Sequence, residues 1–384
     1  MRRVVVLGST GSIGRATLDV ARHLGDLQVV ALSAGRNVEL LVEQIREFRP
    51  EAAAVATAEA AAAVRAAAPA WGGELAWGPQ ALAELAAGPP ADLVLVAVVG
   101  IDGLRPTLAA LEGGRDVALA TKEVLVAAGP LVAAAASRAG RRVLPVDSEP
   151  SAVFQCLGAR GPNEVARLWI TASGGPFLRT PPAAMADVTP AQALRHPTWQ
   201  MGPKVTVDSA TLMNKGFELI EAHWLFGIPA DRIEVVIHPQ SLVHSCVELV
   251  DGTVLAQVGP RDMRLPIQYA LTYPGRRPSP VAPLDLRALG SLGFEAPDSE
   301  RFPCLAYARE ALERGGTALP ALSAADEAAV GMFLAGRIPF LEIGRVIRRV
   351  LDRHRDRAVT RLDDVLDADR EARIDATRAW SAIS

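Results

Sequence analysis

Apolar residues in the first 146 positions fall into short runs separated by Ala-rich stretches of helical character. The runs cover residues 3–8, 27–33, 51–56, 91–100, 116–121 and 141–147. Runs that are apolar almost throughout suit strands that helices cover on both faces. The alternation predicts an α/β fold built on a doubly wound parallel sheet.

The pattern changes after residue 147. The runs 167–173, 204–209, 232–239, 241–250 and 253–259 predict strands, and residues 211–227 predict a helix that ends at Gly227. Asp251 and Gly252 form a hairpin signal between the last two strands. Strands and a helix in this order favour an α+β domain.

The last third of the chain alternates Pro-rich and helical segments. Residues 273–285 are rich in Pro and Arg and predict a linker, and helical patterns follow at 303–314, 319–336, 341–353 and 362–380. We therefore divide the chain into a first domain, a catalytic domain, a linker and a C-terminal α-helical bundle. Their boundaries are 1–146, 147–274, 275–300 and 301–384.

Composition narrows the class of protein. The chain has 384 residues, which is too many for one ordinary core, and 40 basic residues nearly balance 43 acidic ones. This balance gives no reason to expect nucleic acid or a membrane surface as a partner. Cys156, Cys246 and Cys304 form no CxxC pair, and the N-terminus shows no signal-peptide pattern. We expect a protein of the reducing cytoplasm.

A glycine-rich turn follows the first predicted strand. Gly8, Gly11 and Gly14 are spaced GxxGxxG and lead into a predicted helix, with Thr10 and Ser12 as hydroxyl donors. Glycines allow a backbone to approach a pyrophosphate, and a helix N-terminus offers free N–H groups. The pattern indicates a Rossmann-like dinucleotide site; the alternative is an ordinary tight strand–helix turn.

The end of the second predicted strand indicates which dinucleotide binds. An acid that would bind a ribose 2′-hydroxyl is missing there, and Arg36 and Asn37 stand in its place. Since arginine pairs with a 2′-phosphate, we expect NADPH. The alternative is a solvated surface arginine.

Acidic residues gather in two motifs. Asp147 and Glu149 follow the strand 141–147, and alternation along a strand would point both the same way. Asn214 and Glu218 lie four apart, on one helical face. Three carboxylates would hold Mg²⁺ or Mn²⁺ in preference to zinc. The alternative is a set of surface acids paired with Lys and Arg.

Polar groups elsewhere complete the candidate site. Lys122 and Glu123 stand at a strand end, where open α/β sheets bind ligands, and the turn after Ser173 suits an oxyanion or a phosphate. His196 and Trp199 lie in the segment 194–204, which we interpret as a lid. The alternative is a static surface loop.

Several long motifs in the sequence resemble those of one known family. They are GSTGSIG (8–14), KE (122–123), VDSEPSA (146–152), SGGPF (173–177), HPTWQMGPKVTVDSATLMNKGFELIEA (196–222) and HPQSLVHS (238–245). Together they resemble the 1-deoxy-D-xylulose 5-phosphate reductoisomerase family along almost the whole chain. The resemblance implies a homodimer with NADPH-binding, catalytic (also dimerising) and helical domains, which uses Mg²⁺, Mn²⁺ or Co²⁺.

The resemblance also implies a two-stage reaction. The substrate skeleton rearranges by retro-aldol cleavage and re-aldolisation on the metal, and NADPH then reduces the aldehyde to 2-C-methyl-D-erythritol 4-phosphate. This is the committed step of non-mevalonate isoprenoid synthesis. Chelation of a carbonyl and a neighbouring hydroxyl suits such a rearrangement.

Site residues carry over from the resemblance by position. The metal ligands are Asp147, Glu149 and Glu218, and the catalytic set adds Lys122 and His196. The substrate contacts are Lys122, Ser148, Glu149, Ser173, His196, Trp199, Met201, Ser209, Asn214, Lys215 and Glu218, of which Ser173, Ser209, Asn214 and Lys215 form the phosphate pocket. The cofactor contacts are Thr10, Gly11, Ser12, Ile13, Gly35, Arg36, Asn37, Thr121, Glu123 and Gly202.

One position departs from the family pattern. Thr121 stands where the family usually has Asn before Lys-Glu, although threonine can still donate a hydrogen bond. Two other functions compete with the reductoisomerase. One is a different NADPH-dependent, metal-assisted carbonyl reductase, and the other is a sensor that binds NADPH without turnover.

Overall fold

The computed structural model describes residues 1–381. Contacts between residues divide the chain into two compact units. The first unit comprises Met1–Val124, Val132–Ser151 and Asp262–Ala282, and the second comprises Leu125–Leu131, Ala152–Arg261 and the residues from Pro283 onward. The four-part division drawn from the sequence stays a prediction.

A parallel sheet forms the centre of the first unit. Its strands are β1 Arg2–Leu7, β2 Leu27–Ala34, β3 Ala52–Val55, β4 Glu74–Trp77, β5 Leu93–Val96, β6 Asp116–Leu119 and β7 Val143–Pro145. They lie in the order β4-β3-β2-β1-β5-β6-β7, and each neighbouring pair is parallel. The predicted doubly wound sheet is confirmed. The order reverses beside β1, so the carboxyl ends of β1 and β5 border the crevice where such sheets bind ligands.

Helices accompany this sheet in the first unit. They are α1 Ser12–Leu24, α2 Val38–Phe48, α3 Ala58–Ala67, α4 Ala81–Ala87, α5 Leu104–Glu112 and α11 Arg264–Thr272, with a 3₁₀ turn at Gly100–Gly103. α6 Glu123–Ala139 belongs to this unit except for Leu125–Leu131, which belongs to the second. α6 is interrupted at Ala128, shortly before Pro130, since proline cannot continue a regular helix. α11 packs on α1, where Arg264 pairs with Asp19 at 3.0 Å.

A mixed sheet forms one layer of the second unit. Its strands are β8 Val165–Ala172, β9 Ile233–Ile237, β10 Val243–Leu249 and β11 Val254–Val258, in the order β11-β10-β8-β9. β8 and β9 are parallel, whereas β10 is antiparallel to β8 and β11. These four strands confirm the predicted runs at 167–173, 232–239, 241–250 and 253–259.

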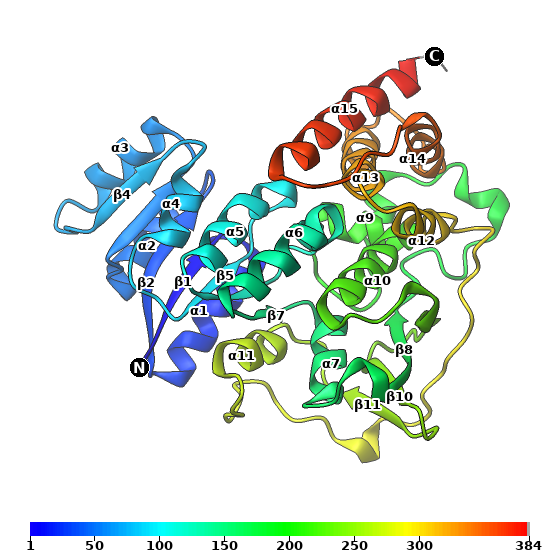
Figure 1. The fold of residues 1–384 in the computed structure, drawn as a ribbon, viewed down its shortest axis with the longest axis horizontal. Coiled ribbons are helices and arrows are strands. Elements are labelled where there is room, and N and C mark those ends of the chain that lie inside the picture. Colours follow the sequence, from blue (N-terminus) through cyan, green and yellow to red (C-terminus); the bar gives the residue numbers. More distant parts are fainter. Residues whose placement is uncertain (382–384) are drawn as a thin grey trace. The chain divides into compact units, whose positions relative to one another are not determined.

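The second unit also contains helices. They are α8 Pro190–Ala193, α9 Pro203–Thr211, α10 Met213–Phe226, α12 Cys304–Arg314, α13 Ala318–Leu334, α14 Glu342–Arg353 and α15 Leu362–Ser381; α7 Ser148–Leu157 begins in the first unit. Short 3₁₀ turns lie at Pro162–Glu164, Pro182–Met185, Ala230–Arg232 and Leu286–Ala288. The predicted C-terminal helices are confirmed as α12 to α15, which pack together (Figure 1).

Helix α14 illustrates why these segments fold as helices. Ile343, Val346, Ile347, Val350 and Leu351 are all buried, and their spacing places them on one helical face. Burial of each such side chain contributes about 1.5–3 kcal/mol. Residues of α13 and α15 provide the surfaces against which α14 packs.

Two local predictions were wrong. Residues 204–209 lie in the helix α9, because Pro203 occupies its first turn and the Thr206 hydroxyl donates to the Gly202 carbonyl. Glu149 lies in the first turn of α7, so strand alternation does not orient it. Asp147 begins that helix, since its carboxylate accepts from the Ser148 N–H at 2.9 Å and its carbonyl from the Ser151 N–H at 2.9 Å.

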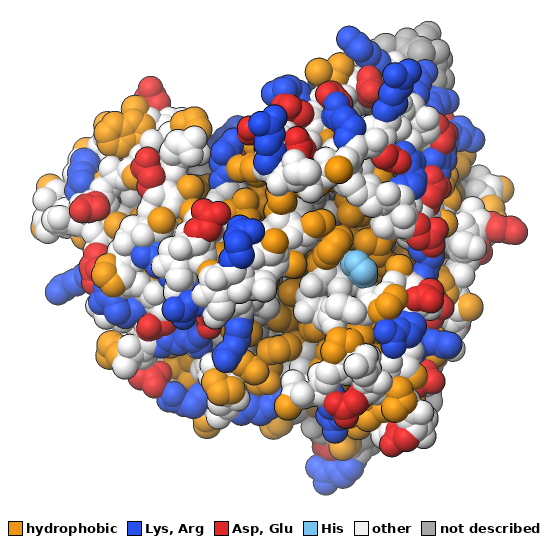
Figure 2. All heavy atoms as spheres, in the orientation of Figure 1, with side chains coloured by type: hydrophobic (Ala, Val, Ile, Leu, Met, Phe, Trp, Pro, Cys, Tyr) orange, Lys and Arg blue, Asp and Glu red, His pale blue; other side chains and the backbone are white. Residues whose placement is uncertain are grey.

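The surface mixes charges of both signs. On the face in Figure 2, basic and acidic side chains are interspersed over α15 and its neighbours. Ion pairs of α15 include Arg373 with Glu327 at 2.7 Å and Arg357 with Glu371 at 2.7 Å. Within residues 1–381, no helix combines the length and the apolar character that a bilayer crossing requires.

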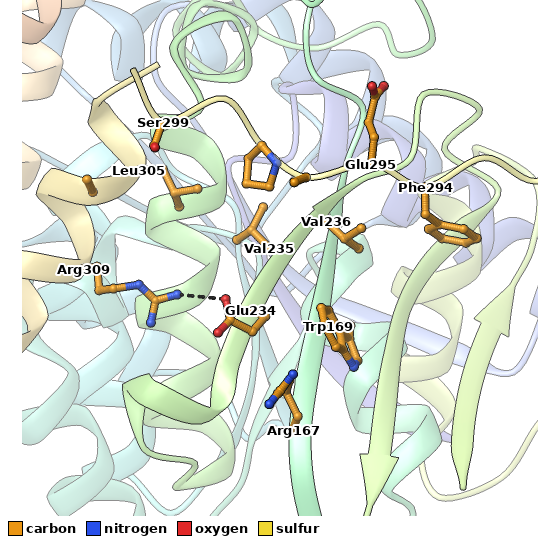
Figure 3. Close-up of a pocket in the computed structure, with 13 residues that line it drawn as sticks. Arg167, Trp169, Glu234, Val235, Val236, Phe294, Glu295, Ser299, Leu305 and Arg309 are labelled. Carbon is orange, nitrogen blue, oxygen red and sulfur yellow. Dashed lines mark ion pairs between the residues drawn. The ribbon is translucent and has the colours of Figure 1, made fainter. Parts of the chain in front are cut away.

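A pocket of about 620 Å³ lies on the outer face of the mixed sheet (Figure 3). Trp169 and Arg167 of β8 and Glu234 of β9 form its floor, and Phe294 closes one side. Arg309 of α12 reaches Glu234 at 3.6 Å. Apolar and charged side chains therefore lie together on a sheet face.

Candidate active site

The glycine-rich turn connects β1 to α1. Gly8 has a φ of +82°, and a Cβ there would lie 2.4 Å from the Ala97 carbonyl oxygen. A Cβ on Gly14 would lie 2.2 Å from the Gly8 carbonyl oxygen. Only glycine fits at these two positions, so α1 can approach the turn closely.

The N-terminus of α1 fits an anionic group. Gly11 is its N-cap, and its first turn holds no acidic residue. Thr10 is half-buried, and Gly11 and Ser12 are exposed. Free N–H groups, and a positive dipole end that no acid in the first turn offsets, suit a pyrophosphate. The chain's own residues thus fit a dinucleotide in this place.

The end of β2 presents the residues expected to read the 2′-phosphate. Gly35, Arg36 and Asn37 are all exposed. Asn37 also caps α2, since its side chain accepts the Leu40 N–H at 3.1 Å. The guanidinium of Arg36 is accessible, and its contact with the cofactor stays a prediction.

Thr121 is held inside the first unit. Its hydroxyl donates to the Val98 carbonyl at 2.5 Å, and the residue is 5% exposed. In this conformation the hydroxyl holds the chain that leaves β5. The neighbouring Lys122 and Glu123 are also buried, and Glu123 begins α6.

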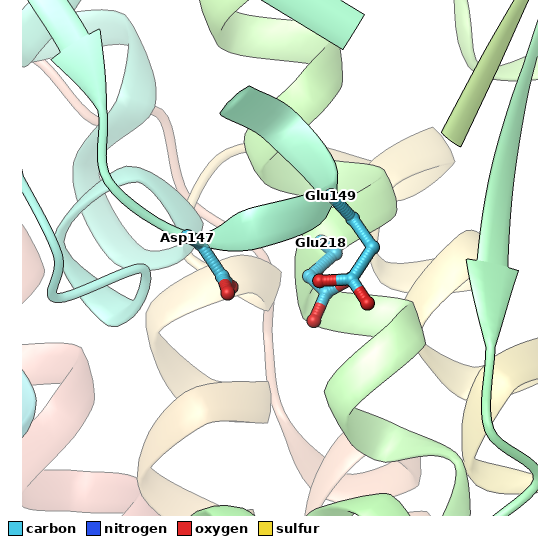
Figure 4. Close-up of side chains that lie close together, drawn as sticks. All are labelled: Asp147, Glu149 and Glu218. Carbon is cyan, nitrogen blue, oxygen red and sulfur yellow. The ribbon is translucent and has the colours of Figure 1, made fainter. Parts of the chain in front are cut away.

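Three carboxylates gather as the sequence predicted. One oxygen each of Asp147, Glu149 and Glu218 lies within 4.8 Å of the other two (Figure 4). Two oxygens bound to one Mg²⁺ ion lie roughly 3 Å apart in adjacent positions and about 4.2 Å apart in opposite ones, so side-chain rotations that bring the three acids closer would close the trio around one ion. Three hard oxygen donors fit Mg²⁺ or Mn²⁺.

Lysines and polar groups contact the trio. The Lys122 ammonium pairs with Asp147, and Ser148 Oγ donates to Glu149 at 2.7 Å. Lys215 Nζ lies 2.5 Å from one oxygen of Glu218. Positive charge beside the carboxylates offsets their mutual repulsion.

Glu218 is the most buried of the three acids, at 1% exposure. Asn214 Nδ2 donates to its other oxygen at 2.6 Å, which confirms that these two residues share a helical face. Asn214 and Lys215 are 7% and 5% exposed. Each oxygen of Glu218 is thus oriented by a neighbour on α10.

A second polar group centres on His196. Its Nε2 lies 2.9 Å from Ser173 Oγ and 3.1 Å from Ser209 Oγ. Its Nδ1 accepts the N–H groups of Thr198 at 3.2 Å and Trp199 at 2.9 Å. An Nδ1 that accepts two hydrogen bonds is unprotonated, so Nε2 carries the proton of the neutral ring.

The remaining predicted residues lie along the same segment. Trp199 and Met201 are half-buried, and the Trp199 ring lies 6.1 Å from that of His244, centroid to centroid. Gly202 is exposed and forms the N-cap of α9. The structure thus brings together His196, Ser173 and Ser209, while the contact of Met201 with substrate stays a prediction.

The cysteines take no part in this chemistry. All three are free thiols. Burial raises the pKa of the Cys246 thiol, and burial followed by the charges of Asp326 and Asp208 raises the pKa of the Cys304 thiol. Both thiols therefore stay protonated and weakly nucleophilic.

Sequence reasoning missed a buried charge cluster formed by Lys204, Asp208 and Asp326. The spacing of Lys204 and Asp208 was an available signal, because opposite charges four apart favour a helix. The part played by Asp326 has no local signal, since its partners lie far away in the sequence.

Comparison with known proteins places the chain beside one family. The family model for 1-deoxy-D-xylulose 5-phosphate reductoisomerase matches residues 4–129, and models of that enzyme's C-terminal regions match 143–226 and 258–375. The reductoisomerase of Symbiobacterium thermophilum is 56% identical over 380 residues, covering 98% of this chain and 97% of that protein. That of Moorella thermoacetica is 54% identical, covering 97% and 96%.

Solved structures agree along the full length. The reductoisomerase from Zymomonas mobilis in complex with NADPH is 44% identical, with a TM-score of 0.93 and 99% of each chain covered. A reductoisomerase complex with NADPH, fosmidomycin and magnesium is 39% identical, with a TM-score of 0.95 and 100% and 99% covered.

Proposed function

The chain belongs to the 1-deoxy-D-xylulose 5-phosphate reductoisomerase family, and we propose that it converts that sugar phosphate to 2-C-methyl-D-erythritol 4-phosphate with NADPH and a divalent cation. The observation that carries this proposal is the gathering of Asp147, Glu149 and Glu218. A plain NADPH-dependent reductase has no need of three converging carboxylates.

A divalent cation and NADPH would supply the Lewis acid and the hydride that the side chains lack. Asp147, Glu149 and Glu218 would hold Mg²⁺ or Mn²⁺, and the turn from Thr10 to Ile13 would hold the NADPH pyrophosphate. A divalent cation polarises a carbonyl and lowers the pKa of a neighbouring hydroxyl, and NADPH supplies a hydride. Both effects suit a rearrangement that ends in a reduction.

Lysines beside the trio can orient the substrate hydroxyls. Lys122 pairs with Asp147 and Lys215 with Glu218, so each ammonium already lies at the carboxylates. Both are nearly buried, at 7% and 5% exposure, where a hydrogen bond from a charged donor contributes more than in water. Ser148 offers a further hydroxyl beside Glu149.

His196 acts as a hydrogen-bond donor in this account. Its Nδ1 accepts two backbone N–H groups, which leaves the Nε2 proton for an oxygen of the substrate. Ser173 and Ser209 stand at that proton. Ser173 and Ser209 would hold the phosphate together with His196, and Asn214 and Lys215 would complete the phosphate pocket on the side of the metal trio.

The segment 194–202, which we name the flap, would cover the bound substrate. Trp199 offers it a broad apolar face, which would exclude water from the reacting carbons. The segment is shorter than the predicted 194–204, because Pro203 and Lys204 belong to α9.

The test of function is direct. NADPH absorbance should fall when 1-deoxy-D-xylulose 5-phosphate is added with Mg²⁺ or Mn²⁺, and the product should have the branched skeleton by NMR. A simple carbonyl reductase would return an unbranched alcohol, and a sensor would bind NADPH without oxidising it. Either outcome would refute the proposal.

The outer face of the mixed sheet would form a homodimer interface. Val254, Ala256 and Val258 of the edge strand β11 point to one exposed face, which continues to Trp169 beside the pocket of Figure 3. Apolar residues on an edge strand favour pairing with another chain. Light scattering should give twice the chain mass, and Val254→Lys should lower the measured mass; a monomeric wild type would contradict this.

The free thiols also fit the expected reducing cytoplasm.

A further inference from the structure

A buried charge cluster begins two residues after the flap. Lys204, the second residue of α9, places its Nζ 2.7 Å from Asp208 Oδ2 and 2.8 Å from Asp326 Oδ2. Asp208 lies one turn further along α9, whereas Asp326 comes from α13. α9 and α13 pack against each other in the second unit (Figure 1). The cluster therefore joins two helices that are far apart in sequence.

The three charges are withdrawn from water. Their side chains are 17%, 2% and 0% exposed for Lys204, Asp208 and Asp326. The Lys204 ammonium also lies 4.6 Å from the centre of the Phe217 ring of α10. Burial strengthens an ion pair and makes the loss of one partner costly. The geometry of Lys204 is consequently fixed from three helices.

The cluster sits between two parts of the candidate site. Gly202, the last residue of the flap, precedes Lys204 by two positions, and Ser209 follows Asp208 directly. Ser209 Oγ contacts His196 Nε2 at 3.1 Å. A shift of α9 would thus move the end of the flap and the hydroxyl that meets His196.

A glycine shows how little room such a shift has. Gly175, in the turn after Ser173, has a φ of +68°, and a Cβ there would lie 2.6 Å from the Ser209 carbonyl oxygen. The turn and α9 are therefore in close backbone contact. The relative position of Ser173, Ser209 and His196 depends on where α9 lies.

We propose that Lys204, Asp208 and Asp326 are positioning residues of the active site, which anchor α9 to α13 and so fix the flap end and Ser209. The predicted effect of the cluster on turnover rests on the proposed function, whereas its predicted effect on the position of α9 does not. The cluster contains none of the metal trio and none of the residues assigned to substrate, and Asp208 directly precedes Ser209. It acts through Ser209 and His196.

Two neighbouring acids on α13 provide a matched comparison. Asp326 faces Lys204, whereas Glu327 pairs with Arg373 of α15 at 2.7 Å. Asp326→Asn and Glu327→Gln each remove one charge from the same helix. A general loosening of the helices would follow from either, but a loss of the α9 anchor would follow only from the first.

Limited trypsin digestion of the full chain gives the readout that does not depend on activity. Arg195 is exposed, whereas Lys204 is held by its partners. Wild type and Glu327→Gln should be cleaved after Arg195 and protected after Lys204. Asp326→Asn should gain cleavage after Lys204. Equal protection in all three proteins, or the same new cleavage in Glu327→Gln, would overturn the anchor.

Kinetics of the same proteins with NADPH and Mg²⁺ give the second readout. Asp326→Asn and Lys204→Met should raise the KM for the sugar phosphate roughly fivefold or more. Lys204→Arg keeps a cation in the cluster, so its KM for the sugar phosphate should lie closer to that of wild type. This variant still tests the proposal if the other variants fail to fold. Unchanged KM values, or equal defects in Lys204→Met and Lys204→Arg, would overturn the proposal. If wild type itself shows no turnover, the proposed function fails, while the digestion still tests the anchor.

Discussion

Replacement of Glu218 by glutamine separates the charge of this residue from its shape. Glu218 is 1% exposed, and its two oxygens meet Asn214 at 2.6 Å and Lys215 at 2.5 Å. Gln fills the same space and still accepts from Asn214. It removes the negative charge, however, and leaves the buried Lys215 ammonium facing an amide.

The magnitude follows from burial. Breaking one partner of a buried ion pair costs about 3–5 kcal/mol, which is a large part of an unfolding free energy of about 5–15 kcal/mol. Metal affinity should also fall by roughly tenfold or more, because even changes behind the ligands cost 10–100-fold. Glu218→Gln should therefore lose both stability and metal binding.

A double variant separates these two losses. Lys215→Met together with Glu218→Gln also removes the buried ammonium that has lost its contact with Glu218, so part of the lost stability should return. Metal affinity should stay low, because the carboxylate ligand is still missing. Urea unfolding measures the first quantity, and calorimetric titration with Mn²⁺ measures the second.

Two results would refute this reasoning. If the double variant is as unstable as Glu218→Gln, the buried Lys215 charge is not the cause of the instability. If Glu218→Gln binds Mn²⁺ as tightly as wild type, Glu218 is not a ligand and the trio of Figure 4 is not the metal site.

Three further predictions address the cofactor and the helical region. Arg36→Ala should lower the preference for NADPH over NADH roughly tenfold, because a charge-assisted bond contributes about 1.5–3 kcal/mol; an unchanged ratio of kcat/KM values would mean that the 2′-phosphate is read elsewhere. Gly14→Ala should abolish tight NADPH binding, since its Cβ would lie 2.2 Å from the Gly8 oxygen, whereas Gly72→Ala, with open space around it, should bind normally in a fluorescence titration. Burial lowers the pKa of His354, so the unfolded chain binds more protons than the folded chain. The stability that the neutral imidazole contributes should therefore be full above the ordinary His pKa of about 6.5 and should be lost as pH falls through the pKa in the folded state. Unfolding midpoints should fall less from about pH 7.5 to about pH 5.5 in His354→Gln than in wild type; equal slopes would contradict this assignment.

The main elements of the fold were predictable because their patterns are long or strongly apolar. The strand β1, for example, is a buried run between a charged start and Gly8. β4 was missed because it is a short edge strand with exposed ends. α9 was mistaken for a strand because its Val and Thr residues alternate with polar ones, although Pro203 and the spacing of Lys204 and Asp208 favour a helix.

The candidate site was predictable in its residues and not in its geometry. The motifs named Asp147, Glu149 and Glu218, but strand alternation was the wrong reason for the orientation of Glu149, which a helix start sets instead. The approach of Glu218 to the other two acids depends on tertiary packing, which no local pattern encodes. Asp326 was missed for the same reason, because its partner lies on α9.

The proposed function depends most on the three carboxylates holding one divalent cation. Crystals grown with NADPH and Mn²⁺ test this directly, because manganese is visible by its anomalous scattering. We predict a peak within bonding distance of one oxygen each of Asp147, Glu149 and Glu218. A Mn²⁺ peak held by other residues would contradict the proposed function. So would the absence of a peak at the trio in crystals grown at a Mn²⁺ concentration that saturates turnover in solution.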